Sequence, residues 1–103
     1  MDDQVNIYRI CKNIQDSVGM PVLTLEFEVM LELYFSGELS AGEVLSRVRA
    51  SQASFSVIAR RMLEEGLLVA NPGYPDRRRT IYSISERARQ IIAAAVRDTS
   101  VAA

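Results

Sequence analysis

The sequence has no histidine, no tryptophan and a single cysteine, Cys11, among its 103 residues. The absence of histidine excludes the usual Ser-His and Cys-His catalytic arrangements and any histidine metal site. One cysteine cannot form an internal disulfide or a metal site built from several thiolates. The five glycines stand singly, so no glycine-rich phosphate loop is present. We therefore expect no enzyme activity, no cofactor and no metal.

Long hydrophobic runs are also absent. No apolar stretch reaches the length that spans a bilayer, and the first three residues, Met-Asp-Asp, lack the basic character of a secretion signal. The composition, 49% apolar and 24% charged, is sufficient for one compact domain over residues 1–103 with a modest core. We expect a cytoplasmic protein that does not associate with a membrane.

Charge is unevenly placed, although the formal net charge is only −1. Residues 1–45 hold two basic and eight acidic residues, whereas residues 46–103 hold ten basic and five acidic residues. Eleven of the twelve basic residues are arginine, which favours oriented contacts over diffuse attraction. The basic second half predicts a surface for an anionic partner, and the acidic first half predicts a surface that faces away from it.

Two consecutive helices are predicted in the middle of the chain. Ser40 and Glu43 form a capping box, in which the serine accepts from an early helical N–H and the glutamate reaches back. Ser51 is a suitable cap for the second helix, over residues 51–65, and Gly66 is a suitable end. The apolar residues of this helix recur at helical spacing: Phe55, Ile58, Ala59, Met62 and Leu63.

The opposite side of the second helix is small, polar and basic. Its residues lie three or four positions apart: Gln52, Ala53, Ser56 and Arg60. Side chains of these types approach base edges closely, because glutamine pairs with adenine and arginine binds phosphate or guanine. An ordinary solvated helix face would have the same composition, so the interpretation depends on the segment after the helix.

A β-hairpin comes next in the chain. Residues 67–70 and 80–84 are β-prone, and the segment between them is rich in proline and glycine. The arginine-rich segment over residues 71–79 ends in four charged residues: Asp76, Arg77, Arg78 and Arg79. Adjacent arginines repel one another unless an anion is near, and Asp76 can hold the guanidinium of Arg78 in one pose. The hairpin tip is therefore predicted to bind phosphate, with a solvated charged tip as the alternative.

A helix-turn-helix followed by such a hairpin is a winged helix-turn-helix, so the predicted fold is mainly α with a small two-stranded β-wing. The chain resembles the MarR family of bacterial transcription regulators over about residues 23–92. The wing is the most specific match: Asp76, one residue, Arg78, five residues, then Ile84 and Ser85. The other matching residues are Ser51, Ser54, Phe55 and Ser56 at the start of the recognition helix, Met62, Gly66 and Leu67 near its end, and Glu86, Arg87, Ala88 and Arg89 after the wing.

The resemblance implies a dimeric regulator that binds double-stranded DNA. Its recognition helix, residues 51–65, would enter the major groove, and its wing, residues 71–79, would reach the minor groove or the backbone. In a dimer the two recognition helices would meet half-sites about 34 Å apart. The predicted DNA-contacting residues are Gln52, Ala53 and Ser56 on bases, Ser51 and Ser54 at the helix start, Arg47, Arg49 and Arg60 on phosphate, and Asp76, Arg77, Arg78 and Arg79 in the wing.

Helices are also predicted near the two ends of the chain. The helix over residues 5–18 has one apolar stripe, and the last helix, over residues 86–97, is capped by Ser85. The stripe consists of Ile7, Ile10, Cys11, Ile14 and Val18. In the resembled family the first helix belongs to the dimer interface, so we expect both helices to form a homodimer. Packing of the first helix on its own domain is the alternative. Cys11 is expected to be a small buried residue, and a redox switch is the second possibility for it.

Residues 25–35 allow two interpretations. Their odd positions are apolar, which indicates a strand, but the length, the composition and the cap Thr24 favour a helix that has Glu28 and Glu32 on its solvent side. We choose the helix, and we expect it to be the central core helix and to end at Gly37.

Two other functions are compatible with the same residues. The first is a protein–protein interaction module, an adaptor or antagonist of a regulator, that uses its first helix and basic wing without binding DNA. The second is a repressor that senses a small-molecule effector between the first helix and the core. A DNA-binding regulator predicts a stable dimer and steep salt dependence, whereas an adaptor predicts little affinity for duplex DNA.

Overall fold

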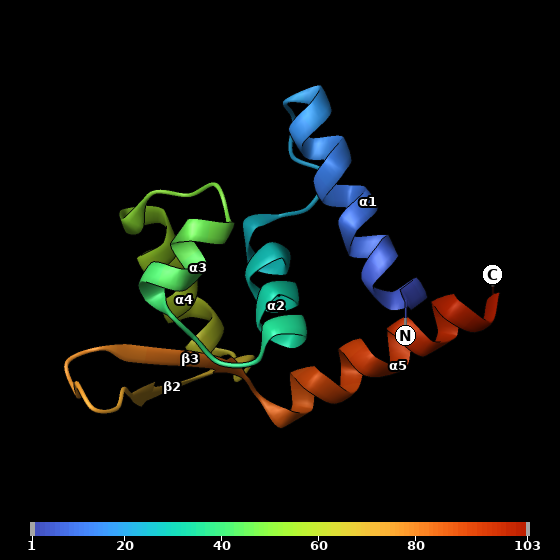
Figure 1. Cartoon of the computed structure of the whole chain (residues 1–103). Coiled ribbons are helices and arrows are strands. Elements are labelled where there is room, and N and C mark those ends of the chain that lie inside the picture. The colour runs from blue at the N-terminus through green and yellow to red at the C-terminus, as the bar shows by residue number, and fades with distance from the viewer. Residues whose placement is uncertain (1, 103) are drawn as a thin grey trace.

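Helices and one small antiparallel sheet make up the chain in the computed structural model, which describes the backbone of residues 2–102 and the side chains of residues 8–95 (Figure 1). The helix-turn-helix and the wing hairpin lie at the left of Figure 1, and α1 and α5 lie at the right. In chain order the elements are α1 (Asp2–Val18), α2 (Leu25–Ser36), β1 (Leu39–Ser40), α3 (Ala41–Arg47), α4 (Gln52–Glu64), β2 (Leu68–Pro72), β3 (Thr80–Ile84) and α5 (Glu86–Ala102).

Hydroxyl side chains begin four of the helices, as predicted. The Ser85 hydroxyl caps α5 by accepting from the N–H of Ala88 at 3.1 Å. The Thr24 hydroxyl caps α2, and the Ser51 hydroxyl caps α4 by accepting from the N–H of Ser54. Ser40 and Glu43 form the capping box of α3, with each side chain accepting from the backbone N–H of the other residue. These caps occupy N–H groups that have no partner inside the helix, so the local sequence sets where each helix starts.

Glycines end α2 and α4, also as predicted. Gly37 and Gly66 have φ angles of 86° and 75°, a conformation that residues with a side chain rarely adopt. The end helices are longer than predicted, because α1 begins at Asp2 and α5 extends to Ala102. An apolar stripe identifies a helix but does not mark its last turns.

The sheet has three strands rather than the predicted two. Its order is β1-β3-β2, with antiparallel pairing on both sides of β3. Leu39 pairs with Tyr82, and Leu68 pairs with Ile84. The sequence did not reveal β1 because two residues are too short to show an alternating pattern, and Ser40 is also the N-cap of α3.

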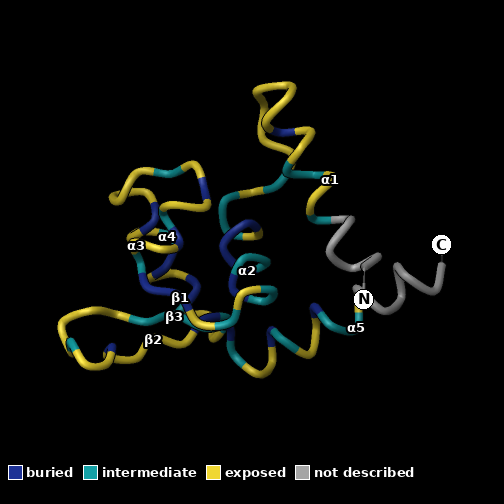
Figure 2. Tube along the Cα trace, in the orientation of Figure 1, coloured by how far each residue is buried: buried dark blue, intermediate teal, exposed yellow. Residues whose placement is uncertain are grey.

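The core lies between α2, the helix-turn-helix and the sheet, where the buried segments gather in Figure 2. Val29 and Leu33 of α2 are completely buried, which confirms α2 as the central helix. The largest buried side chains of the other helices are Val44, Phe55 and Met62, and the sheet and α5 add Leu68, Ile84, Ala88 and Ile92. None of the helices, as far as the chain is described, is long and apolar enough to cross a membrane.

The prediction that Glu28 and Glu32 face solvent is wrong. Glu28 is only 6% exposed, and its Oε2 accepts from Lys12 Nζ at 2.6 Å. Glu32 is half-buried, and its Oε2 accepts from the Tyr8 hydroxyl at 2.6 Å. A carboxylate can be buried when it is paired and hydrogen-bonded, and these partners come from α1, far from α2 in sequence. The pattern within α2 therefore could not show them.

α1 packs its polar side against α2 and leaves its apolar stripe exposed. Ile10, Ile14 and Val18 are all exposed, which is contrary to the alternative that this stripe packs on its own domain. Cys11 is only partly buried, and the Ile7 side chain lies outside the described residues. Burial of Tyr8, together with its hydrogen bond to Glu32, raises the pKa of its hydroxyl far above the ordinary value.

Candidate nucleic-acid interface

The outer face of α4 consists of exposed side chains that point away from the core: Gln52, Ala53, Ser56, Val57 and Arg60. Four of the five were predicted to be exposed, and the structure confirms it. In the described part of the chain, the side chains of Gln52, Ser56 and Arg60 make no hydrogen bond or ion pair. Their donors and acceptors are therefore available to a partner molecule.

Three contacts hold α4 in place behind this outer face. The ring of Phe55 packs edge-on against Tyr82 of β3, with centroids 5.5 Å apart. Arg61 pairs with Glu26 of α2. A guanidinium nitrogen of Arg87, on α5, donates to the carbonyl oxygen of Glu65 at 2.8 Å, at the C-terminal end of α4. The outer face is thus presented by a helix anchored to α2, the sheet and α5.

Ser51 and Ser54 lie at the start of α4 and hydrogen-bond to each other. The Ser54 N–H donates to Ser51 Oγ at 3.0 Å, and the Ser51 hydroxyl donates to Ser54 Oγ at 3.1 Å. Both residues are exposed next to Gln52. Ser51 caps the helix by accepting from the Ser54 N–H, and a contact of either residue with DNA stays a prediction.

The wing loop between β2 and β3 is closed by backbone hydrogen bonds. The Gly73 N–H donates to the Arg79 carbonyl at 2.7 Å, and the Arg79 N–H donates to the Asp76 carbonyl at 3.2 Å. A Cβ at Gly73 would lie 2.9 Å from the Asp76 carbonyl oxygen, which is too close. Only glycine fits here without a shift of the backbone, so the loop has a defined shape.

Asp76 holds Arg78 at the end of the wing, which confirms the predicted pairing. Arg78 Nε lies 3.1 Å from Oδ1 of Asp76, and Nη2 lies 3.4 Å from Oδ2. These side-chain hydrogen bonds, followed by the one from the Arg78 N–H, lower the pKa of Asp76. The Arg78 side chain is still 92% exposed, so its orientation is set while its outer donors remain free.

The two other arginines of the wing have no side-chain partner in the described part of the chain. Arg77 and Arg79 are exposed, and neither forms a hydrogen bond or ion pair through its guanidinium. The Arg79 charge nevertheless acts on Glu43, whose pKa is lowered first by its hydrogen bonds with Ser40 and then, to a smaller extent, by Arg79 and Arg47. Positive charge is therefore concentrated at the wing with little acidic compensation.

Arg47 and Arg49, unlike the arginines above that have no side-chain partner among the described residues, each have a carboxylate partner, on α2 and α1 respectively. Arg47 Nη1 donates to Ser36 Oγ at 2.6 Å and lies 3.7 Å from Glu32 Oε1. Arg49 Nη2 lies 3.1 Å from Asp16 Oδ1. Together with the pairs already described, these contacts join α1 to α2, to α3 and to the segment just after α3. The residues of this α1–α2–α3 polar network are Tyr8, Lys12, Asp16, Glu28, Glu32, Ser36, Arg47 and Arg49. The prediction that these two arginines bind phosphate is not tested by this placement.

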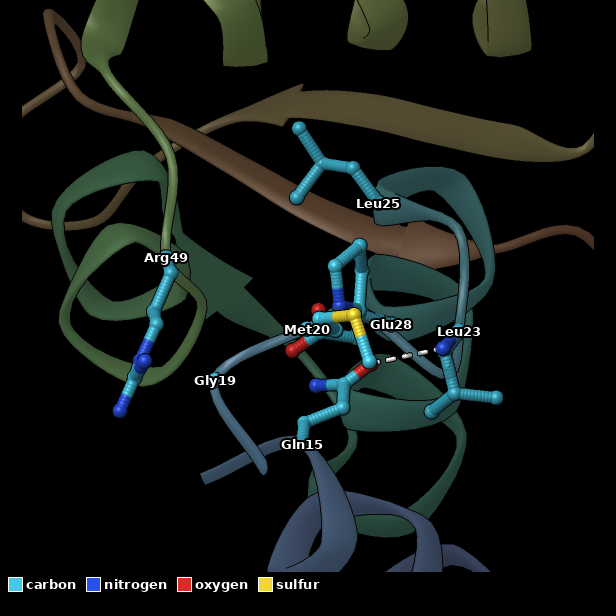
Figure 3. Close-up of a pocket in the computed structure, with 8 residues that line it drawn as sticks. Gln15, Gly19, Met20, Leu23, Leu25, Glu28 and Arg49 are labelled. Carbon is cyan, nitrogen blue, oxygen red and sulfur yellow. Dashed lines mark hydrogen bonds between the residues drawn. The ribbon is translucent and has the colours of Figure 1, made fainter. Parts of the chain in front are cut away.

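A pocket of about 250 Å³ lies beside this network, between the end of α1 and α2, with Arg49 at its edge (Figure 3). It lies between the first helix and the core, the place predicted from the sequence for the effector of the alternative ligand-sensing function. The buried Gln15 uses its Oε1 to accept from the N–H groups of Val22 and Leu23, at 2.9 and 2.7 Å. Glu28 is bound to Lys12. Because these polar groups are already paired, the pocket gives no specific support to an effector.

Two exposed side chains of the candidate interface were not predicted from the sequence. Tyr74, at the tip of the wing, is 95% exposed, and Val57, on the outer face of α4, is 70% exposed. The helical spacing that placed Phe55 inward also places Val57 outward, so that signal was present in the sequence. Tyr74 had no such signal, because its exposure depends on the loop conformation.

Sequence comparisons find no relatives: no family profile matches the chain, and no curated protein matches it. Comparison of structures finds transcriptional regulators with the same fold. The transcriptional regulator PA4135 is 17% identical with a TM-score of 0.68, and the match covers 96% of this chain and 69% of that one. BpsR of Bordetella bronchiseptica, studied for the regulation of its DNA binding by 6-hydroxynicotinic acid, is 20% identical with a TM-score of 0.63 over 90% of this chain and 71% of its own.

MarR from E. coli matches as well, including a mutant form of it in complex with operator DNA. That structure is 11% identical with a TM-score of 0.64, and the match covers 87% of this chain and 62% of the MarR chain. At these identities the likeness concerns the fold. The chain therefore has a MarR-like winged helix fold, and it spans about two thirds of the length of these regulators.

Proposed function

We propose that this chain is a dimeric DNA-binding transcription regulator of the MarR type, not an enzyme, that acts in the bacterial cytoplasm. One observation carries the proposal. Recognition helix α4 and the wing after it present polar and arginine side chains that have almost no partners within the described residues: Gln52, Ser56, Arg60, Arg77, Arg78 and Arg79. Unpaired guanidinium groups on neighbouring elements suit the phosphates and base edges of a duplex.

In this proposal α4 lies in the major groove with its outer face toward the bases. Gln52 is suited to adenine, whose N6 and N7 match the acceptor and donor of the amide. Arg60 is suited to phosphate or guanine. Arg78, oriented by Asp76, reaches the minor groove or the backbone while Arg77 and Arg79 add positive charge to the wing.

The homodimer is supported by the outward-facing apolar stripe of α1. Ile10, Ile14 and Val18 recur every four residues and are exposed, and Ile91 of α5 is exposed as well. A contiguous apolar stripe on a small domain is typical of a surface that another molecule covers. A second copy of the chain would cover it symmetrically and would place two α4 helices on half-sites about 34 Å apart.

The structural neighbours support the same function. PA4135 is described as a transcriptional regulator, BpsR is studied for the regulation of its DNA binding, and MarR is bound to operator DNA in one structure. The proposal extends this property of the neighbours to the present chain, and the chain's own exposed residues are the reason for doing so.

The experiment combines solution mass with DNA binding. The mass is measured by light scattering, and affinity for duplex DNA from upstream of the protein's own gene is measured by fluorescence anisotropy across a salt titration. We expect a dimer whose log affinity falls linearly with log salt, with a slope of about 0.9 for each neutralised phosphate. Arg78→Ala is expected to weaken binding and to reduce that slope.

The matched control is Arg9→Ala, which removes the same charge from an exposed position on α1. We expect Arg9→Ala to leave the salt slope unchanged. A monomer that does not bind duplex DNA at low salt would contradict the proposal and would favour the protein–protein interaction module. Equal binding by Arg78→Ala and the unchanged protein would contradict the role of the wing only.

A further inference from the structure

Val57 is the most exposed large apolar side chain on α4. It is 70% exposed, whereas Phe55, two residues earlier, is buried in the core. A β-branched residue at an exposed helix position does not stabilise the helix, because its χ1 freedom is restricted there. Alanine, leucine and glutamate have a higher helix propensity than valine.

The neighbours of Val57 on the outer face are all small or polar. Ala53 lies one turn before it on the same side, Ser56 directly precedes it, and Arg60 lies three positions after it. The two apolar side chains, Ala53 and Val57, are separated by about 6 Å along the helix axis. Polar groups on both sides can fix the position of this apolar pair against a partner.

We propose that Val57 contacts the C5-methyl group of a thymine in the major groove and makes the protein select thymine at that position. This inference rests on the proposed function. The thymine methyl is the apolar group that a base pair offers at its major-groove edge, so it is the chemical counterpart of an exposed valine on a recognition helix. Ala53 leaves room for the close approach that such a contact needs.

Exposure and position together support this contact. A single exposed valine elsewhere on the surface would need no explanation. Val57, however, lies among side chains with free hydrogen-bonding groups, on the helix whose inner side is anchored by Phe55, Arg61 and the Glu65 carbonyl. Docking of this helix in a groove would bring Val57 against the bases together with Ser56.

The test replaces thymine by deoxyuridine, which pairs identically but lacks the methyl group. A bound site is first selected from a randomised duplex library, and each thymine of the site is then replaced in turn while affinity is measured at fixed salt. For the unchanged protein we expect a loss of about fourfold at one thymine in each half-site, the factor for burying one methyl group. Val57→Ala should bind the thymine duplex more weakly and should be insensitive to the same replacement.

The control is Val69→Ala, an exposed valine on β2, which should keep the full sensitivity to the methyl group. Val57→Ala is expected to fold normally, because alanine favours a helix and the site is exposed, and circular dichroism checks this. If Val57→Ala remains as sensitive to the replacement as the unchanged protein, the inference is overturned while the proposed function stands. If the unchanged protein binds no duplex at any salt concentration, both are overturned.

Discussion

Two groups of arginines within the described residues have opposite surroundings. On the outer face of α4 and in the wing, Arg60, Arg77 and Arg79 have no side-chain partner in the described part of the chain. In the α1–α2–α3 polar network, Arg47 and Arg49 each have a carboxylate within reach. The residue type is the same in both regions, so the surroundings decide how many guanidinium donors are left for a partner. Arg78 lies between the two cases, because it is paired with Asp76 but 92% exposed.

The uneven charge of the two halves of the chain is partly used up in ion pairs between them. The acidic first half was predicted to face away from the partner of the basic half. Several of its carboxylates instead pair with arginines of the basic half. Glu26 pairs with Arg61, Glu32 with Arg47, and Asp16 with Arg49. Folding therefore leaves the positive charge of the outer face and the wing largely uncompensated, although the net charge of the chain is only −1.

The largest expected effect is on the free energy of unfolding, and it distinguishes the buried side of α4 from its outer face. Phe55→Ala removes a ring that is buried against Tyr82, so we expect the free energy of unfolding to fall by about 3–5 kcal/mol. Ser56→Ala, at the next position on the outer face, should change it by less than about 0.5 kcal/mol. Urea denaturation measures both. A similar loss in the two variants would show that the outer face is packed in solution.

The next effect concerns the buried ion pair of the polar network. Glu28→Ala removes the carboxylate partner of the Lys12 ammonium, which is largely buried and keeps only its hydrogen bond to the Arg47 carbonyl oxygen. We expect a loss of roughly 2–3 kcal/mol, below the range for fully buried pairs because Lys12 keeps some contact with water. The control Glu64→Ala, at an exposed position of α4, should be nearly neutral. Equal stability of the two variants would mean that the pair is solvated.

A smaller effect compares one arginine from each region. Arg47→Ala removes the hydrogen bond to Ser36 and the contact with Glu32, and because this arginine is well exposed we expect a loss of only about 1 kcal/mol. Arg60→Ala should leave stability unchanged and should weaken DNA binding more than Arg47→Ala does. Thermal unfolding and anisotropy measure the two properties. The reverse order in the two assays would show that Arg47 leaves its partners to bind phosphate.

The smallest effect is a titration within the wing. Hydrogen bonds from Arg78 lower the pKa of Asp76 below its ordinary value of 3.8, so NMR titration of the carboxyl group should give a value under 3.8. A lowered pKa means that the pair is intact above the ordinary value and is lost as pH falls through the lowered one. Arg78→Ala should return the pKa toward 3.8, and the control Arg77→Ala should not. An unshifted pKa in the unchanged protein would mean that the pair does not persist in solution.

Much of the fold could be predicted from short stretches of sequence. The caps Thr24, Ser40 and Ser51 and the terminating glycines act within one helical turn, so their effect is readable without knowledge of the rest of the chain. The Asp76–Arg78 pair was predictable for the same reason, because the two residues lie two positions apart. The inward and outward sides of α4 followed from its helical period.

Apart from the bounds of the two end helices, the failed predictions involve partners that are distant in sequence. Glu28 was placed in solvent because its partner, Lys12, lies 16 residues away on another helix. The strand β1 was missed because it exists only through pairing with β3, which lies far along the chain beyond the helix-turn-helix. The stripe of α1 was read correctly as apolar, but its period could not tell whether it packs inward or stays exposed.

The sequence by itself therefore determined the helices and their caps, the hairpin, and the chemical character of the outer face of α4 and of the wing, because these depend on interactions between near neighbours. Tertiary structure alone decided which charges are used internally. Only when α1 packs its polar side against α2 do Lys12 and Tyr8 meet Glu28 and Glu32, and only then is the apolar stripe of α1 left for another molecule to cover. The pattern of residues along the chain shows the type of each side chain. The partner of a side chain depends on packing between segments that are distant in sequence.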